Sequence, residues 1–347
     1  MLKMAHLPGR PSRMTLIHRT LLLFLAACAA VPAQPKVSLI EVFGNRRVSS
    51  ERILRALSLK PGAPLPRSKA EAEETLEALD GVARAALEAF CCEEGQPVLY
   101  IGVQERGQPG LDLRPEPAGA ALLPPAIVQV YEDFTQALGR AAPEDLEEDF
   151  SAGHSLMRGV ALRALQERFA ALAELHAGEL RETLAKSASE DHRAIAAYVL
   201  GYAPDKAAAA DSLQQALRDP SQLVRSNAAR ALKAMAAKPD IRARIQPTWF
   251  VEMLNSPALT DRLEGARALL TLFETLSPQT QAHLRERALP ALMEMARFRH
   301  LPHALPAFLI LGKAAGLPDS EVQTAWSAGP ADREKLLKQI ASALRAK

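Results

Sequence analysis

Two segments near the N-terminus carry apolar residues at the two-residue spacing of β-strands. Residues 37–43 are rich in β-branched side chains, with Ile40 and Val42 on one face, and residues 97–103 alternate in the same way. The Ala-rich residues 82–92 favour a helix by composition, but a Gly-containing turn and a strand follow them directly, as in a β-hairpin. We therefore predict three strands in this part of the chain.

Two short helices are predicted between the first two strands. Ser49 or Ser50 can accept hydrogen bonds from the free N–H groups at the start of the first helix, which a Lys-Pro-Gly triplet ends. The second helix begins near Ser68 and stops at an Asp-Gly pair. Residues 36–106 therefore predict a small α+β domain with the element order β-α-α-β-β.

A connector rich in Gly and Pro, residues 107–125, separates this domain from a long helical region. Beyond it, apolar residues recur three and four positions apart, which is the spacing of amphipathic helices. We divide the helical region into an adaptor, residues 126–175, a set of repeats, residues 176–316, and a C-terminal cap, residues 317–347. The chain is therefore predicted to be mainly α-helical, and we expect few contacts across the connector.

Three segments of the helical region align in one register. They begin at Arg193, Arg225 and Arg262, which are 32 and 37 residues apart, and each continues with small and aliphatic residues. An Asp-Pro pair precedes the second segment, with Asp219 six residues before Arg225. Repetition on this scale predicts helix pairs that bury their apolar faces by stacking on one another.

The middle segment, with DP followed by VRSNAARAL, resembles the signature of HEAT repeats. The resemblance covers about 140 residues and implies an α-solenoid, which is a stack of helix pairs. It also implies that Asp219 and Arg225 are structural residues of a ladder between repeats, with Arg193 and Arg262 at the matching positions. The surface of such a solenoid suits a protein partner.

Residues 38–65, SLIEVFGNRRVSSERILRALSLKPGAPL, and residues 98–105, VLYIGVQE, resemble a POTRA domain, the polypeptide-transport-associated module of envelope secretion proteins. The resemblance implies a non-catalytic domain at whose sheet edge an extended client can add a strand. The Ala-rich middle strand departs from the family and weakens the case for this docking edge. A small α+β domain that serves only as a spacer is the alternative.

Composition and charge exclude several classes of protein. The 347 residues are 48% hydrophobic and 5% aromatic, which is too apolar for a disordered chain and suits packed helices rich in Ala and Leu. A polytopic membrane protein is excluded because the sequence has no run of 18 or more apolar residues. The formal net charge of +2 argues against a dedicated nucleic-acid-binding protein.

Residues 1–33 read as an export signal. Four Lys and Arg residues precede a short apolar run, Leu21–Ala27, and small residues follow it; loss of these four charges leaves a net charge of −2. Cleavage after Ala33 fits ordinary signal peptidase. The sequence LAAC ending at Cys28 instead resembles the lipoprotein box, in which Cys28 is lipidated and anchors the protein by acyl chains. Either alternative predicts an exported bacterial protein of the periplasm or cell envelope, with an outer-membrane lipoprotein as one form.

Candidate catalytic residues are few. His154 lies near Asp149 and Ser155, but no G-x-S-x-G nucleophile elbow surrounds the serine, so we favour a histidine that braces a helix entry. His300 and His303 are three residues apart, and two ligands do not make a metal site. The sequence has no Walker loop, Rossmann glycine motif or HExxH, so we predict no cofactor and no metal.

Cys91 and Cys92 are adjacent on the predicted middle strand. Neighbouring Cα atoms lie about 3.8 Å apart, which is below the usual separation in a disulfide. We therefore favour one buried and one partly exposed free thiol over a strained disulfide ring. No CxxC motif supports a redox role, and no neighbouring ligands support a zinc site.

Two functions from different classes fit these features. The favoured one is a non-catalytic scaffold or adaptor of the cell envelope that binds protein partners through the solenoid and the POTRA-like domain. It binds no nucleic acid and meets the membrane only through a lipid anchor or a membrane-protein partner. The alternative is an exported enzyme or ligand-binding protein that uses His154 and Asp149. A bilin-lyase-like HEAT protein is a remote alternative, because such enzymes work in the cytoplasm.

Overall fold

The computed structural model describes residues 35–93 and 95–345, with the side chains of residues 92 and 93 excepted. The predicted export signal and the candidate lipidation site Cys28 lie outside these residues. The described part is mainly α-helical, with 15 α-helices and a small N-terminal sheet, as the sequence predicted. Within it, no helix combines the length and the apolar character that a membrane span needs.

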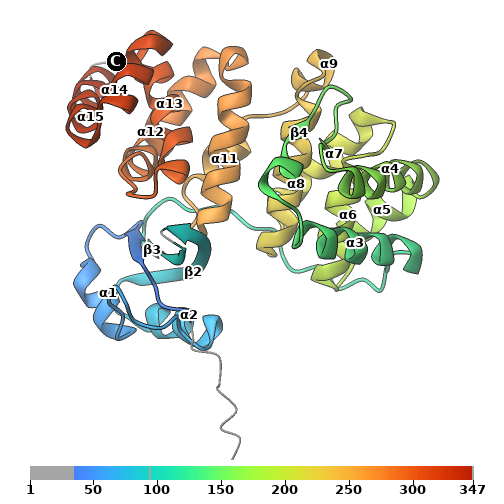
Figure 1. The fold of residues 1–347 in the computed structure, drawn as a ribbon, viewed down its shortest axis with the longest axis horizontal. Coiled ribbons are helices and arrows are strands. Elements are labelled where there is room, and N and C mark those ends of the chain that lie inside the picture. Colours follow the sequence, from blue (N-terminus) through green and yellow to red (C-terminus); the bar gives the residue numbers. More distant parts are fainter. Residues whose placement is uncertain (1–34, 94, 346–347) are drawn as a thin grey trace, which may run out of the picture. The chain divides into compact units, whose positions relative to one another are not determined.

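The N-terminal α/β module, residues 35–106, has the predicted element order (Figure 1). Its elements are β1 (Leu39–Phe43), α1 (Ser50–Ala56), α2 (Lys69–Glu77), β2 (Val82–Glu93) and β3 (Gln96–Glu105). The strands lie in the order β1-β3-β2, with β1 parallel and β2 antiparallel to the central β3. The Ala-rich segment is therefore a strand, because pairing with β3 overrides its helical composition.

Serine caps start both helices of the module. The Ser49 and Ser68 hydroxyls each accept a hydrogen bond from the backbone N–H three residues further on. Leu76, on α2, is buried against one face of the sheet together with Leu99 and Ile101. This face gives the module a small hydrophobic core of its own.

A buried carboxylate closes the turn after β1. Glu105 is fully buried, and its Oε1 accepts hydrogen bonds from the backbone N–H groups of Arg46, Arg47 and Val48 at 2.7–2.8 Å. Burial by itself raises the pKa of Glu105, but these hydrogen bonds outweigh it and lower the pKa to about 2. The turn is therefore fixed by an ionised side chain at the end of β3.

The helical region follows the connector, and a short hairpin, β4–β5, interrupts it. Its elements are α3 (Pro125–Leu138), η1 (Pro143–Leu146), β4 (Glu148–Asp149), β5 (Leu156–Met157), α4 (Val160–Leu175), α5 (Ala177–Lys186), α6 (Glu190–Leu200), α7 (Lys206–Ala216), α8 (Gln222–Met235), α9 (Pro239–Arg242), α10 (Thr248–Met253), α11 (Leu259–Leu272), η2 (Phe273–Thr275), α12 (Pro278–Met295), α13 (Leu301–Ala315), α14 (Asp319–Ala328) and α15 (Pro330–Arg345).

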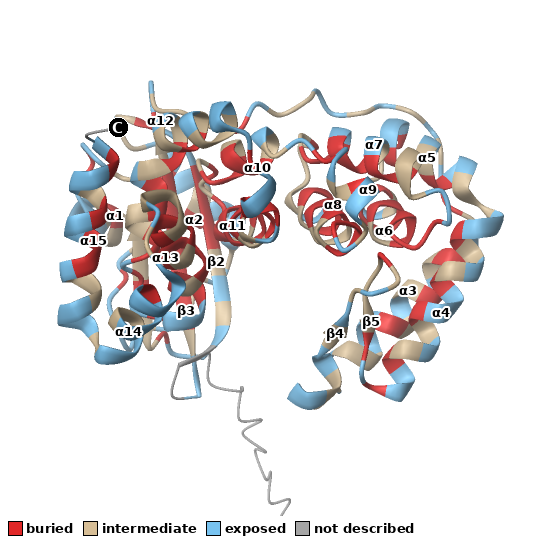
Figure 2. Ribbon diagram, turned by 90° about the horizontal axis from the view of Figure 1, so that it is seen from above, coloured by how far each residue is buried: buried red, intermediate tan, exposed pale blue. Residues whose placement is uncertain are grey.

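Helix pairs α5–α6, α7–α8, α10–α11 and α12–α13 stack side by side (Figure 1). The second helices of the pairs, α6, α8, α11 and α13, pack on one another in that order. We call these the inner helices, and we call α5, α7, α10 and α12 the outer helices. Buried residues run along the inner helices (Figure 2). This stack is the solenoid-like architecture that the sequence predicted.

Arginines at the repeated positions join neighbouring helix pairs. Arg193 on α6 donates to the Asp219 carboxylate at 3.0 and 3.1 Å. Arg225 on α8 donates to the Asp261 carboxylate of α11 at 2.7, 3.0 and 3.2 Å. These four residues are at most 5% exposed. Each arginine therefore reaches a carboxylate of the next pair, and Arg225 contacts Asp219 only through the backbone carbonyl of Asp219.

The same arginines also hold the turn in front of their own helix. Arg193, Arg225 and Arg262 each donate to the backbone carbonyl six residues earlier, at 2.7 or 2.8 Å. Arg262 ends the ladder on Glu294 of α12, at 2.8 Å. The ladder thus fixes the spacing of consecutive helix pairs and satisfies backbone carbonyls that would otherwise be buried without a donor.

The connector, residues 107–125, runs along the helical region. Arg114 N donates to Arg218 O at 2.7 Å, and Gly119 N donates to Lys186 O at 2.8 Å. The connector is therefore bound to the helical region, and the module packs on the same region, whereas we expected few contacts across the connector. An extended segment has no hydrogen-bond partners of its own, so its backbone groups pair with the turns between the helices.

The second face of the module's sheet packs on the helical region. Phe43 and Tyr100 contact the ring of Phe298, with centroids 5.7 and 5.5 Å apart. The Tyr100 hydroxyl lies 2.8 Å from Nδ1 of His303 on α13. Residues from Pro35 onward form one compact unit. Both faces of the sheet are therefore covered, one by α1 and α2 and the other by inner helices.

Carboxylates of the module cap two inner helices. Glu88 on β2 accepts a hydrogen bond from Thr260 N at 3.0 Å, in the first turn of α11. Glu41 on β1 accepts one from Arg299 N at 2.8 Å, just before α13. Neither helix receives a side-chain cap from its own N-cap residue. The module therefore supplies acceptors and negative charge where helix N-termini need them.

Cys91 differs from the prediction. Its side chain is exposed on β2 and is disulfide-bonded, whereas we favoured a free thiol. The separation of adjacent Cα atoms bears only on a disulfide between neighbouring residues, whereas an exposed thiol is open to oxidation.

Candidate functional site

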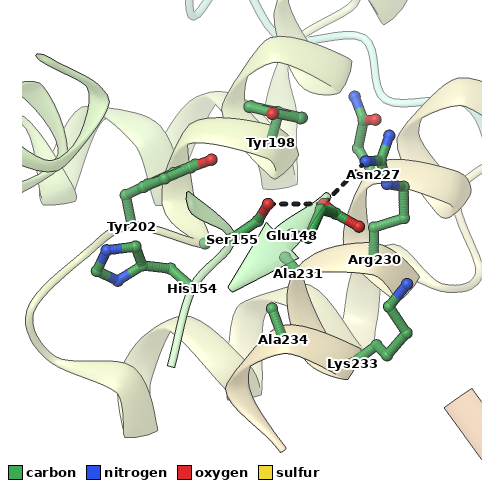
Figure 3. Close-up of a pocket in the computed structure, with 11 residues that line it drawn as sticks. Glu148, His154, Ser155, Tyr198, Tyr202, Asn227, Arg230, Ala231, Lys233 and Ala234 are labelled. Atoms are coloured by element: carbon green, nitrogen blue, oxygen red, sulfur yellow. Dashed lines mark hydrogen bonds and ion pairs between the residues drawn. The ribbon is translucent and has the colours of Figure 1, made fainter. Parts of the chain in front are cut away.

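The β4–β5 hairpin, residues 147–157, lies against α6 and α8 and encloses a small cavity with them (Figure 3). Its return strand is anchored on α4 and on the turn after α6. Met157 N donates to Gln166 Oε1 at 2.6 Å, and Gln166 Nε2 donates to the Tyr202 hydroxyl at 3.0 Å. Met157 and Gln166 are both buried. The base of the hairpin is therefore fixed to the helices.

Glu148 is the polar centre of the cavity. Its Oε1 accepts a hydrogen bond from Ser155 Oγ at 2.6 Å and one from Arg230 Nη2 at 3.3 Å (Figure 3). Arg230 is on α8, so this ion pair joins the hairpin to an inner helix. The serine donates to a carboxylate, an arrangement that orders the hairpin.

His154 braces the hairpin against the α6–α7 turn. Its Nδ1 lies 3.3 Å from Lys206 Nζ, and its ring centroid is 5.1 Å from that of Tyr202. Burial, and then the charges of Lys206 and Lys238, lower the pKa of His154 to about 4. The ring is therefore neutral at pH 7.

The residues of the alternative catalytic hypothesis do not assemble. Asp149 is exposed, and its Oδ1 accepts a hydrogen bond from Ser151 N at 2.8 Å. Ser155 donates to Glu148. Among the described contacts, no hydrogen bond joins His154 to Asp149 or Ser155, so a nucleophile–base–orienter arrangement is not formed.

Aromatic rings support the helices beneath the hairpin. The Tyr198 and Tyr202 centroids are 5.9 Å apart, and the Phe169 ring of α4 lies 5.5 Å from each. Burial raises the pKa of both tyrosines, so they stay neutral. This cluster gives the cavity a rigid apolar wall.

Positive side chains surround the cavity on the helix side. Lys206, at the start of α7, has its pKa lowered to about 8 by burial and by the charge of Lys238. Burial also lowers the pKa of Lys233 on α8, whose Nζ lies 5.4 Å from the Phe150 ring centroid. The hairpin therefore presents an acid and an aromatic ring to a basic surface.

The cavity is too small for an organic ligand. Its volume is about 20 Å³, which is room for roughly one water. Among the described residues, no group of three or more His, Cys, Asp or Glu side chains is arranged to hold a metal. Any larger ligand would have to displace the hairpin.

The two other histidines of interest lie in the contact between the module and α13. Their ring centroids are 4.5 Å apart, and His303 also stacks edge-on with Phe90 at 4.9 Å. Burial, and then the charges of His300 and Arg267, lower the pKa of His303 to about 4. His303 is therefore a neutral partner of the Tyr100 hydroxyl.

The sequence pointed to the residues of the site that lie on the hairpin, but not to those on or next to the helices. It named His154, but not Tyr198 and Tyr202, or Arg230 and Lys233. Arg230 and Lys233 are three residues apart on α8, which places both on one face of the helix, and Tyr202 follows Tyr198 by four residues, just beyond the end of α6. This spacing was the feature of the sequence that could have indicated these residues.

A comparison with protein families finds a match within the helical stack. The family model described as HEAT repeats matches residues 178–270. This span runs from α5 to α11 and contains Arg193, Arg225 and Arg262.

Residues 178–270 are therefore similar to HEAT repeats. The HEAT match covers well under half of the chain, and the α/β module lies outside it. No curated protein matches the sequence. Within this span α6, α8 and α11 are the second helices of their pairs, and α8 carries Arg230 and Lys233 under the hairpin.

Acid should loosen the docking of the module on α13. His303 has a pKa of about 4 in the folded protein against 6.5 in the unfolded chain, so the unfolded state binds more protons between these values. Stability should therefore fall by about 3 kcal/mol as the pH drops from 6.5 to 4. Urea unfolding should show this loss in the wild type and a smaller one in His303→Gln. Equal pH dependence of the two proteins would show that His303 does not carry the effect.

Proposed function

We propose that the protein is a non-catalytic scaffold that binds protein partners through its HEAT repeats. HEAT repeats are generally protein-interaction surfaces, which supports this function over catalysis. The observation that carries the proposal is the surface of α6 and α8, where aromatic and basic side chains meet a cavity of only about 20 Å³. A surface of this kind suits a polypeptide, because it offers charge and ring contacts over several helices.

We propose that the module is a fixed part of the scaffold. The Glu77 and Glu73 carboxylates of α2 accept hydrogen bonds from Ala85 N and Leu87 N, at 3.0 and 2.7 Å. These N–H groups belong to the edge strand β2, so a client strand would compete with the module's own side chains for them. The resemblance to POTRA domains is supported by the β-α-α-β-β order, but edge docking is not the function that we propose.

We propose that the protein is exported and acts in the periplasm or cell envelope. The charged and apolar pattern of residues 1–33 supports export. The disulfide at Cys91 also supports it, because disulfides persist in oxidising compartments. The partners would then be envelope proteins, and lipidation at Cys28 would hold the scaffold at a membrane.

A ligand-binding or enzymatic role is the second candidate. The lowered pKa values of His154, which lines the cavity, and of Lys206, whose Nζ lies 3.3 Å from His154 Nδ1, favour it, because functional sites gather such groups. Against it, Ser155 donates to Glu148 and the cavity holds about one water. The bilin-lyase-like alternative gains no support from this geometry.

Partner capture after cross-linking in intact cells, followed by envelope fractionation, tests the scaffold. Wild type and His154→Ala should both retain the partner. The inner-helix variant Arg230→Ala/Lys233→Ala/Arg267→Ala should lose most of it. A matched variant with three exposed cations replaced elsewhere, Arg168→Ala/Lys186→Ala/Arg244→Ala, should keep it.

Two results would overturn the scaffold. One is the absence of any captured protein in the wild type. The other is an activity that His154→Ala alone abolishes while the fold stays intact, which would restore the enzymatic alternative.

A further inference from the structure

The segment that leads into the β4–β5 hairpin is strongly acidic. Residues 144–149 contain five carboxylates in six positions. The helices beneath carry the opposite charge, with Lys206 on α7, Arg230 and Lys233 on α8, and Lys238 just after α8. The charges of the two surfaces are therefore complementary.

The hairpin contacts the inner helices as a bound peptide would. Glu148 pairs with Arg230 at 3.3 Å, and the Phe150 ring lies 5.4 Å from Lys233 Nζ, within reach of a cation–π interaction. The Glu148 and Arg230 side chains are 22% and 34% exposed. An acid and an aromatic residue two positions apart thus occupy two adjacent basic positions without being buried there.

The basic surface is not fully neutralised by the hairpin. Among the described residues, neither Lys206 nor Lys238 forms an ion pair with a carboxylate. Lys206 Nζ donates to Gly201 O at 2.8 Å, and Gly153 of the hairpin tip lies against the stems of both lysines. Positive charge therefore remains for a more acidic occupant.

A buried acceptor next to these cations also lacks a partner. Glu264 on α11 is 6% exposed, and its Oε2 accepts no hydrogen bond, whereas Oε1 accepts one from Arg267 at 2.7 Å. The charge of Glu264 acts on both Arg230 and Lys233. A backbone N–H of an extended peptide on this surface would supply the missing donor.

The hairpin is held by few bonds of its own. Its ladder consists of two residue pairs, Glu148 with Met157 and Asp149 with Leu156. Its base is fixed by the bond of Met157 N to Gln166 Oε1 and by that of Arg158 N to Glu147 O at 2.8 Å, whereas Glu148, Phe150 and His154 are all partly exposed. Among the described contacts, residues 148–155 are bonded to the helices only by long side-chain contacts, at 3.3 Å for Glu148 with Arg230, 3.4 Å for Ser155 with Gln166 and 3.3 Å for His154 with Lys206. Few bonds therefore have to break for these residues to leave while the base stays anchored.

We propose that the β4–β5 hairpin occupies a binding site for a partner protein and imitates the segment that binds there. In its place, the inner face of α6, α8 and α11 accepts a segment of a partner protein that carries carboxylates next to an aromatic residue. This proposal rests on the scaffold function and names the surface and the chemistry of the partner. The hairpin competes with the partner, so the free protein binds more weakly than its contacts alone would allow.

The test uses a fluorescent peptide with the sequence of residues 143–155, PEDLEEDFSAGHS, and the mature protein. Anisotropy should show weak binding to the wild type. The variant Glu148→Gln/Phe150→Ala, which releases the hairpin, should bind about tenfold more tightly or better, because the competent fraction rises. Arg230→Gln added to that variant should weaken binding at least about fivefold, and added salt should weaken it as well.

Controls separate this result from general charge effects and from misfolding. Lys186→Gln, an exposed cation on an outer helix, should leave the affinity unchanged. Glu148→Gln and Phe150→Ala are also measured singly, since both positions are partly exposed and should fold with an unchanged melting temperature. A peptide with Phe replaced by Ala should bind at least about fivefold more weakly, because the ring contact is lost.

Equal affinity of the wild type and the released variant would overturn the proposal. So would equal competition by polyphosphate or an oligonucleotide, which would show a general anion surface. If the peptide result fails while partner capture succeeds, the scaffold function stands and its binding face lies elsewhere. If both fail, the scaffold function itself falls.

Discussion

Replacing Arg225 by alanine should lower the free energy of unfolding by about 3–5 kcal/mol. Arg225 is 5% exposed and donates to both Asp261 oxygens and to the carbonyls of Asp219 and Pro220. Its removal leaves a fully buried carboxylate with Ser256 Oγ as its remaining donor, at 2.6 Å. The loss of stability comes mainly from the buried Asp261 charge that is left without its cation, rather than from the lost attraction between the two side chains.

Urea unfolding followed by circular dichroism measures the effect. Arg244→Ala is the matched control, because Arg244 pairs with Asp211 at 3.3 Å but both side chains are more than half exposed. It should change stability by no more than about 1 kcal/mol. If Arg225→Ala proves as mild as Arg244→Ala, the ladder does not join the HEAT pairs.

Replacing Gly102 by alanine should detach the α/β module from the HEAT repeats. A Cβ at this position of β3 would lie 1.7 Å from Pro257 O and 2.6 Å from the Phe43 ring. The first contact is with backbone of the helical region, which cannot rotate away. The module and the repeats must therefore separate, at a cost of about 3 kcal/mol or more.

Limited proteolysis detects this separation, because the connector is bonded to the helices in the wild type and should become accessible in Gly102→Ala. Gly178→Ala is the control, since nothing lies within 4 Å of a Cβ there, and a helical alanine should stabilise it slightly. Wild-type cleavage rates in Gly102→Ala would mean that the sheet does not dock through this face.

The sequence predicted the elements of the module but only one face of its sheet. The alternation over residues 97–103 places Leu99, Ile101 and Val103 on one face of the strand, yet Val98 and Tyr100 on the other face are also fully buried. The uninterrupted apolar run VLYIGV is typical of a strand covered on both faces. An alternating pattern predicts a strand with one buried face. It therefore did not indicate that the other face packs on the helical region.

The ladder shows a different limit. The repeated arginines can be read from the aligned segments, but Asp261 cannot. In the third segment Ser256 stands where the second has Asp219, six residues before the arginine. The carboxylate comes instead from Asp261, the residue before Arg262. It occupies the equivalent place in the ladder, although its position in the sequence is different.

The candidate site depends on pairs that are far apart in the chain. Glu148 and Arg230 are 82 residues apart, and neither position follows a motif. Sequence alone could mark the acidic segment and the basic helix face separately. Only the return of the hairpin over α8, which Met157 and Gln166 fix, brings the two charges together.

The partner-capture experiment tests the central claim most directly when the contact face is recorded. A photo-cross-linking amino acid is placed at Ala231, which lines the cavity on α8, or at Gln215, which is exposed on the outer helix α7. We expect a cross-linked partner from Ala231 and little or none from Gln215. Adducts from Gln215 alone, or from neither position while capture by other means succeeds, would contradict binding at the inner face of the HEAT repeats.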